Sequence, residues 1–332
     1  MIFVTGGTGL LGSHLLFQLT NSDVQIKAIY REEEKIKTVE KIFSFYDPIN
    51  FKNRLKKIKW VHCDILDIIS LEEELKSCKT VYHCAALVSF YRKDFYQLMK
   101  INREGTANIV NACLNNNISK ICYVSSTAAI GSNDDIVTEE TKWKQSPSTS
   151  GYSISKYSAE KEVWRGVEEG LNAVIVNPCL LIGAGNWKES SMTIFKTIDD
   201  GLKFYTSGSN AFVDARDVAE IMEKLMNSDI NNERFLCIGE NSSFINMLSI
   251  VAQKLNKKAP SIKVSKFLMK LSWLISGIVS KMIGKKPVIT KETANSAFSN
   301  TIYDASKVKN TLNFQFKSLE ESISNAVQGR IE

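Results

Sequence analysis

The 332 residues are enough for about two domains, or for one large α/β unit with a smaller lobe. Hydrophobic residues make up 44% and charged residues 23% of the chain, as in globular proteins, so the composition excludes a disordered chain. The net charge of +6 comes without a zinc-finger or RNA-binding signature, and we expect no nucleic-acid partner.

The cysteines and the first residues bear on the cellular compartment. Seven cysteines occur without CxxC spacing, which predicts neither a metal site nor a disulfide framework and fits a reducing cytoplasm. The stretch MIFVTGG leads from the first residue directly into a strand, so we expect no signal peptide. Together these features predict a cytoplasmic protein.

The first half of the chain alternates short β-rich runs with helical patterns. Strand-like runs lie at residues 1–6, 24–30, 57–65, 80–87, 120–127 and 172–183. This alternation predicts a parallel sheet covered by helices on both faces, the doubly wound α/β (Rossmann) fold. We assign residues 1–185 to this domain, with a late return near residues 211–238, and residues 186–332 mainly to a smaller C-terminal lobe that binds the substrate.

The stretch VTGGTGLLGSHL, residues 4–15, predicts a phosphate cradle. Its glycines satisfy both GxGxxG and GxxGxxG, and they lie between an apolar strand and an amphipathic helix. In that context glycines permit a tight turn and close approach to a pyrophosphate, and the helix N-terminal amides face the anion. We therefore predict a bound dinucleotide, held by Gly6, Thr8, Gly9, Leu10, Leu11 and Gly12.

The end of the second predicted strand indicates which dinucleotide is bound. A site that prefers NAD usually has a carboxylate there, about 20 residues on, that binds the ribose hydroxyls. In this chain the position falls on Tyr30, and Arg31 follows. A guanidinium pairs bidentately with a 2′-phosphate, so Arg31 predicts NADP(H). Glu32 and Glu33, either of which can turn back toward a ribose, keep NAD as the alternative.

Three polar residues predict carbonyl chemistry. Tyr152 and Lys156 are four residues apart on a predicted helix and share a face. A free phenol has a pKa of about 10, and Lys156 and an oxidised nicotinamide ring would both lower the pKa of Tyr152. We also predict that Tyr152 and Lys156 contact the cofactor, where Lys156 can hold the nicotinamide ribose hydroxyls. Ser126 ends a predicted strand, where it can hold the substrate oxygen that Tyr152 protonates. Ser125 and Thr127 are the alternatives, as is a hydroxyl that only satisfies a turn.

Apolar residues recur at helical spacing from Val264 to Ile283. The uncharged run between Lys270 and Lys281 is far shorter than the ~20 residues of a membrane span, so we expect no span. Two interpretations stay open: the helix of residues 264–283 packs against the smaller lobe, or it contacts a membrane surface or a partner.

Short motifs follow one another in an order that points to a family. They are TGGTGLLG at 5–12, CDILD at 63–67, HCAA at 83–86, NREGT at 102–106, YVSS at 123–126, YSISK at 152–156, NPCLLIG at 177–183 and FVDARD at 212–217. Over nearly the whole chain this series resembles the extended short-chain dehydrogenases/reductases, the NAD-dependent epimerase/dehydratase family. The stretches AIYRE and HCAALVSF look most like the branch of dihydroflavonol reductases and 3β-hydroxysteroid dehydrogenases.

The resemblance implies further contacts to the cofactor. Asp64 and Ile65 would contact the adenine, while Ala85 and Ala86 would line the pyrophosphate and ribose. Beside the nicotinamide would lie Pro178 and Cys179, the latter in place of the more usual glycine or threonine.

The resemblance also implies a proton path and a homodimer. Asn102 resembles the family's helix-bending asparagine, which supports a water-mediated path to the active-site lysine; a helix cap is the alternative role. The helices expected at residues 101–116 and 152–170 are those that commonly form a dimer interface in relatives, although Val163 and Trp164 fit a core equally well.

Three functions are compatible with these residues. We prefer an NADP(H)-dependent reductase of an aldehyde or ketone, in which Tyr152 gives the proton. The second is a nucleotide-sugar epimerase with bound NAD; dehydration is disfavoured because Thr127 and Ala128 stand where a dehydratase has an Asp-Glu pair. The third is a non-catalytic dinucleotide-binding sensor. The small-molecule substrate pocket, or alternatively the core, would contain Phe90, Tyr91, Trp187, Phe204 and Tyr205.

Overall fold

The computed structural model describes residues 1–131, 136–146, 149–283, 286–287 and 289–331. Its largest sheet has seven parallel strands in the order β12-β7-β5-β4-β1-β2-β3. The bounds are β1 Ile2–Thr5, β2 Ile26–Tyr30, β3 Ile58–His62, β4 Thr80–His83, β5 Lys120–Val124, β7 Ala173–Pro178 and β12 Glu233–Cys237. The predicted doubly wound fold is confirmed, and its strand order reverses between β1 and β4.

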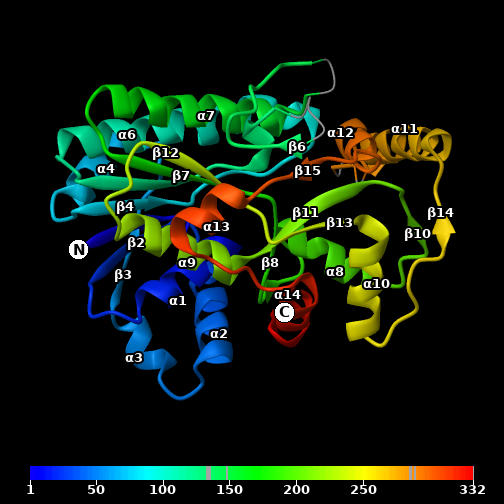
Figure 1. Ribbon diagram of the computed structural model, residues 1–332, viewed down its shortest axis with the longest axis horizontal. Coiled ribbons are helices and arrows are strands. Elements are labelled where there is room, and N and C mark those ends of the chain that lie inside the picture. The colour runs from blue at the N-terminus through cyan, green and yellow to red at the C-terminus, as the bar shows by residue number, and fades with distance from the viewer. Residues whose placement is uncertain (132–135, 147–148, 284–285, 288, 332) are drawn as a thin grey trace.

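Helices cover both faces of this sheet (Figure 1). Side chains alternate along each strand, so Val4 packs with α1 and α9 in one core, while its neighbour Phe3 packs with α4, α6 and α7 in another. On the first face lie α1 (Leu10–Leu19), α2 (Ile36–Tyr46) and α9 (Ala215–Met226); on the second lie α4 (Ile68–Leu75), α6 (Gly105–Asn115) and α7 (Gly151–Glu168). Both cores are thus shielded from water, as an all-parallel sheet requires.

A second layer of structure follows β7. A three-stranded sheet, β13-β11-β8, packs with α8, α10 and α14 around a third core that contains Trp187. The bounds are β8 Leu180–Ile182, β11 Ser209–Asp214, β13 Glu240–Ser243, α8 Thr193–Asp199, α10 Phe244–Lys254 and α14 Leu319–Gln328. Between β11 and β13 the chain returns to the large sheet through α9 and β12, and α13 (Ser306–Leu312) packs on both.

Three pairs of short strands and four further α-helices complete the described part of the fold. Three pairs of two-residue strands are β6 (Ile136–Val137) with β15 (Ile302–Tyr303), β9 (Gly185–Asn186) with β16 (Arg330–Ile331), and β10 (Phe204–Tyr205) with β14 (Ile262–Lys263). The remaining α-helices are α3 (Phe51–Leu55), α5 (Phe95–Leu98), α11 (Lys266–Ile283) and α12 (Lys291–Ser296). Within the described ranges, no helix has the length and apolar character to cross a bilayer.

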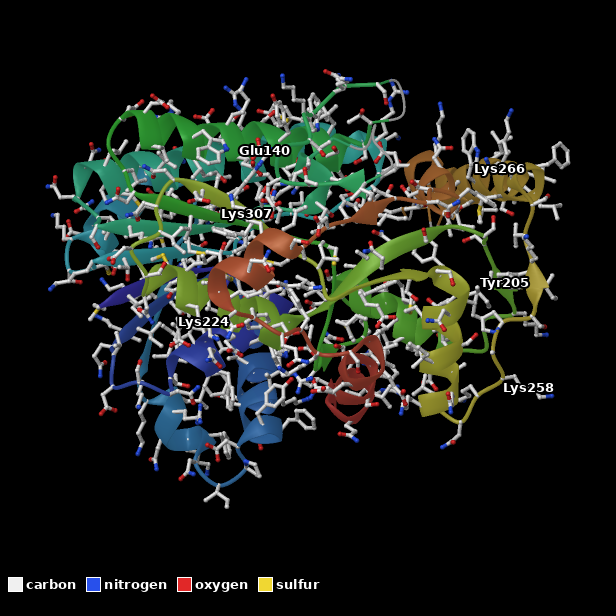
Figure 2. All side chains as sticks on the ribbon, in the orientation of Figure 1. Glu140, Tyr205, Lys224, Lys258, Lys266 and Lys307 are labelled. Atoms are coloured by element: carbon white, nitrogen blue, oxygen red, sulfur yellow. The ribbon has the colours of Figure 1, made fainter. Side chains whose placement is uncertain are left out.

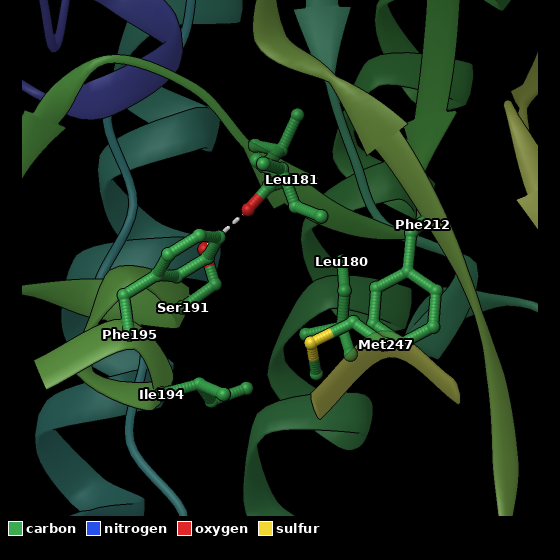
Figure 3. Close-up of a pocket in the computed structure, with 8 residues that line it drawn as sticks. Leu180, Leu181, Ser191, Ile194, Phe195, Phe212 and Met247 are labelled. Atoms are coloured by element: carbon green, nitrogen blue, oxygen red, sulfur yellow. Dashed lines mark hydrogen bonds between the residues drawn. The ribbon is translucent and has the colours of Figure 1, made fainter. Parts of the chain in front are cut away.

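The third core contains a small cavity of about 10 Å³ (Figure 3). Apolar side chains of β8, β11, α8 and α10 line it, and the Ser191 hydroxyl donates a 2.6 Å hydrogen bond to the Leu181 carbonyl. A space of this size holds about one water molecule, so it is a packing defect rather than a substrate pocket. Trp187 is buried nearby and donates to the Ala326 carbonyl, which makes it a core residue.

The turn between β1 and α1 generates a stability prediction. A Cβ on Gly12 would lie 2.1 Å from the Gly6 carbonyl oxygen, whereas a Cβ on Gly9 would lie 3.4 Å from the same atom. We expect Gly12→Ala to lower the free energy of unfolding by about 2 kcal/mol or more, and Gly9→Ala by less than about 1 kcal/mol. Urea unfolding without added dinucleotide measures both. Equal losses in the two variants would show that the close approach is relaxed at little cost.

Candidate active site

The glycine turn lies in the crevice where the strand order reverses. Gly6 has a φ of +67°, and a Cβ there would lie 2.6 Å from the backbone nitrogen of Ala85 at the end of β4. Gly9 is the N-cap of α1 and supplies no side-chain cap to the first helical turn. The first-turn amides therefore remain available to an anion, and the missing side chains leave room for it. The turn fits a dinucleotide pyrophosphate.

The other predicted cofactor residues lie at the same edge of the sheet. Because parallel strands share one direction, the structure brings the carboxyl ends of β1, β2, β3, β4, β5 and β7 together. At these ends lie Thr8, Leu10, Leu11, Arg31, Asp64, Ile65, Ala85, Ala86, Ser126, Pro178 and Cys179.

Not every one of these side chains faces outward. Leu11 is buried in the first core, and Ile65 is buried where a Cβ on Gly105 would meet it at 2.5 Å. Each therefore offers a ligand its main chain. Arg31 is exposed, and among the described residues it has no ion-pair partner, whereas Glu32 lies 3.5 Å from the Lys35 ammonium.

Ser126 and Tyr152 meet where β5 ends and α7 begins. Ser126 is half-buried, and its Oγ accepts a hydrogen bond from the Ala128 amide at 3.1 Å. Ser125 is fully buried and donates to Glu160 at 2.6 Å, so its hydroxyl is already engaged. Burial raises the pKa of Tyr152, and the neighbouring Ser126 side chain lowers it. Ser126 is thus the better placed of the two serines to share an oxygen with Tyr152.

Lys156 lies behind Tyr152 with two close partners. Its ammonium donates to the Tyr123 hydroxyl at 2.7 Å and to the Val124 carbonyl at 2.8 Å. Tyr123 lies on β5 with its ring toward α7, and this places an acceptor directly in reach. Burial lowers the pKa of Lys156 itself to about 7, against the opposing charge of Glu160.

Asn102 lies inside a continuous helical run, in a π-helical segment, η3 (Met99–Glu104), between α5 and α6. A helix cap is therefore excluded. Its amide donates to the Leu87 carbonyl and to Ser155 Oγ, both at 2.9 Å, and its Oδ1 accepts from the Leu87 amide. The side chain thus ties the segment after β4 to the residue before Lys156.

A buried row of polar groups, which the sequence did not reveal, runs from Thr5 at the end of β1 through His83 to Thr106 of α6. Thr5 Oγ1 contacts His83 Nδ1 at 2.7 Å, and His83 Nε2 contacts Thr106 Oγ1 at 3.0 Å. Thr106 donates its one hydroxyl proton to the Asn102 carbonyl, so the His83 proton resides on Nε2. Burial lowers the pKa of His83 to about 3, and the Lys156 charge adds to this shift. A neutral His83 therefore stands behind Tyr123 and Lys156.

Glu160 is a second group that motif analysis missed. One helical turn beyond Lys156, it is buried, accepts from Ser125 and from the Asn177 amide at 2.9 Å, and pairs with Arg234 at 3.1 Å. Its carboxylate joins β5, α7, β7 and β12. The spacing of four residues from Lys156 was the available signal.

An open cavity of about 450 Å³ lies beside the segment after β4. The ring of Phe90 packs against Tyr152 with 5.7 Å between centroids, so this segment forms an apolar wall next to the phenol. The cavity is lined by Tyr91, Arg92, Lys93, Gly277, Ser280 and Pro287. Phe90 therefore lies beside the phenol and Tyr91 lines the cavity, whereas Phe204 is more than half exposed on β10.

The burial of Lys156 predicts a pH dependence of stability. Its pKa is about 7 in the folded protein against 10.5 as the ordinary value, so between these pH values the unfolded chain binds more protons and stability rises with pH. We expect the wild type to gain stability relative to Lys156→Met from pH 7 to 10, by up to about 1.4 kcal/mol per pH unit. Urea unfolding across this range, with exposed Lys188→Met as control, measures it. A difference that does not change with pH would contradict the lowered pKa.

Comparisons with known proteins agree with this geometry. The model of the NAD dependent epimerase/dehydratase family matches residues 2–239. A putative dihydroflavonol 4-reductase of Synechocystis is 27% identical, over 98% of this chain and 93% of that protein. An anthocyanidin reductase of Arabidopsis thaliana is 26% identical, over 76% and 80% of the two chains.

The fold is similar to that of solved enzymes. The structure of a UDP-glucose 4-epimerase of Thermotoga maritima superimposes with a TM-score of 0.76 at 18% identity, over 99% of this chain and 97% of that one. At that identity the likeness concerns the fold alone. With the family model matching well over half of the residues, the chain belongs to the NAD-dependent epimerase/dehydratase family, the extended short-chain dehydrogenases/reductases, whose cofactor is a nicotinamide dinucleotide.

Proposed function

We propose that the protein is an NADP(H)-dependent reductase that converts an aldehyde or ketone to an alcohol. The observation that carries the proposal is the meeting of Ser126 and Tyr152 at the carboxyl end of β5, with Lys156 one helical turn behind. The names of the curated relatives, both reductases, support it. When bound, the nicotinamide supplies the hydride.

The protein groups would manage the proton and the substrate oxygen. The Ser126 hydroxyl donates a hydrogen bond to the carbonyl oxygen, and the Tyr152 hydroxyl transfers its proton to the same atom. Because burial raises the pKa of Tyr152, the phenol is protonated at neutral pH, which is the form that reduction requires. Lys156 lies one helical turn after Tyr152, and with a pKa of about 7 it can hold or release a proton near neutral pH. Phe90 keeps water from the phenol.

The glycine turn and α1 would hold the pyrophosphate, and Arg31 would select the cofactor. Arg31 is exposed at the end of β2. Glu32, one of the two carboxylates that compete for that position, lies within ion-pair distance of Lys35 instead. This leaves the guanidinium to bind the 2′-phosphate of NADP(H).

Assembly and location are part of the proposal. A cytoplasmic homodimer would pair through α6 and α7, which lie side by side in one outer layer (Figure 1). Val163 is buried in the second core and Trp164 packs partly against it, so neither is free for an interface. The pairing surface would instead carry charged residues such as Arg103 and Arg165, which now bind Glu162.

A nucleotide-sugar epimerase is the second candidate. The family name favours it. Such an enzyme retains NAD through its cycle. The apolar Phe90 wall and Arg31 weigh against it, because neither suits a sugar diphosphate with bound NAD.

Removal of the Tyr152 hydroxyl tests the chemistry. We expect Tyr152→Phe to lower turnover by roughly 10² to 10⁴-fold with dinucleotide binding retained, because the phenol supplies the proton. The measurement is NADPH oxidation with a panel of carbonyl compounds that includes dihydroflavonols, aromatic aldehydes and steroid ketones. Tyr157→Phe is the matched control, because Tyr157 lies on the same helix as Tyr152 but stacks on Trp143. Unchanged turnover in Tyr152→Phe would exclude the mechanism, and a wild type inert toward the whole panel would favour the non-catalytic sensor.

The cofactor preference tests Arg31. We expect protein stripped of nucleotide to bind NADPH at least about tenfold more tightly than NADH, and Arg31→Ala to lose this preference. Fluorescence titration measures both affinities, with exposed Lys52→Ala as control. If NAD copurifies with the protein and NADPH binds weakly, the Arg31 argument is wrong and the epimerase becomes the leading candidate.

A further inference from the structure

Helix α11 exposes its apolar face to solvent, whereas an ordinary surface helix buries that face. Apolar side chains on one broad face point to solvent, with Phe267 75% exposed and Ile278 61% exposed; the same face carries Leu268, Leu271, Leu274, Ile275 and Val279. Residues on the opposite side are less exposed, and several of them are small or polar: Ser272, Ser276, Gly277 and Ser280. Of the two interpretations left open by the sequence, packing of the apolar face against the smaller lobe is therefore wrong. A surface helix normally buries its apolar stripe.

The apolar patch extends beyond α11. The strands β10 and β14 pair directly before the helix, and their Phe204 and Ile262 are each about half exposed. At the other end, the Ser276 hydroxyl accepts from the Ile289 amide, which fixes the inward side of the helix. An exposed apolar surface of this extent marks an interaction site.

Charge separates this region from the rest of the molecule. Residues 241–291 contain ten lysines and no aspartate or glutamate. The other residues carry 32 basic and 36 acidic side chains, a net charge of −4, so the positive charge of the protein resides in this one segment. Figure 2 shows Lys258 and Lys266 at the same end of the molecule. Lys258, Lys263, Lys266 and Lys270 have no ion-pair partner among the carboxylates that the structure describes.

The combination identifies one kind of partner. We propose that α11 docks the protein on the surface of an anionic lipid bilayer, with the helix lying in the plane of the interface. The apolar face would enter the acyl boundary while the flanking lysines bind phosphate headgroups. Among the described residues, neither α11 nor any other helix is long and apolar enough to cross a bilayer.

A second copy of the chain suits this surface poorly. A two-fold interface would place the same patch on both sides, and the lysine-rich segments would then face each other and repel. An anionic bilayer supplies the opposite charge and an apolar phase together. Docking would also bring the 450 Å³ cavity near the bilayer, since Gly277 and Ser280 of α11 form one of its walls.

Vesicle flotation tests the proposal with the full-length protein. We expect binding to vesicles of phosphatidylcholine mixed with phosphatidylglycerol, and binding weaker by about tenfold or more to phosphatidylcholine alone or at high salt. Phe267→Ser with Ile278→Ser should abolish binding. The matched control is Ile49→Ser with Ile69→Ser, which changes two isoleucines at least as exposed, 87% and 79%, far from α11 in sequence. Lys266→Gln with Lys270→Gln should reduce the preference for anionic vesicles.

Three outcomes would overturn the proposal. The first is failure of the wild type to float with the anionic vesicles, and the second is equal binding to both vesicle types. The third is a dimer in sedimentation velocity that Phe267→Ser with Ile278→Ser converts to a monomer, which would assign the face to a second copy. None of these readouts depends on catalysis, so the result stands apart from the proposed reductase activity.

Discussion

The reversal of strand order between β1 and β4 is the constraint on which the site depends. At this point the connections of the sheet run to opposite faces and leave a crevice at the carboxyl edge. Gly6, at a positive φ, presents no side chain to the Ala85 backbone, so the turn after β1 can approach the end of β4 closely. The parallel sheet brings the loops that follow six strands to this edge, and the cofactor and substrate contacts proposed for this protein come from those loops.

The fold and the edge residues could be predicted from the sequence because both depend on local patterns. Alternating strand and helix periodicity sets the parallel sheet, and parallel strands must bring their following residues to one edge. The hydrogen-bond partner of Lys156 was harder to predict, because Tyr123 lies 33 residues away in the chain. A signal was nevertheless present: Tyr123 is two residues beyond Ile121, so it points to the same face of β5, the face that α6 and α7 cover.

The orientation of α11 could not be predicted in the same way. Helical periodicity specifies that a helix has an apolar side, but not which side the rest of the protein touches. The Ser276 hydroxyl accepts a hydrogen bond from the Ile289 amide on the inward side of the helix, and this leaves Phe267 and its neighbours outside. The absence of carboxylates from residues 241–291 was visible in the sequence. This absence of carboxylates supports binding to an anionic surface only once the apolar face is known to be exposed.

Burial of the Lys156 side chain lowers the stability of the folded protein, but it also gives the site a group that can exchange a proton near neutral pH. An exposed lysine is charged throughout the neutral range, whereas Lys156, with a pKa of about 7, changes protonation state there. The same burial keeps Tyr152 protonated and His83 neutral, so Lys156 is the one of these three groups whose charge changes near neutral pH. Glu160 opposes the loss of charge on Lys156 and holds the ends of β5 and β7 against α7. Its removal would therefore lower the pKa of Lys156 further and loosen Ser126 at the same time, because Asn177, which binds the Ser126 carbonyl, would lose its carboxylate partner.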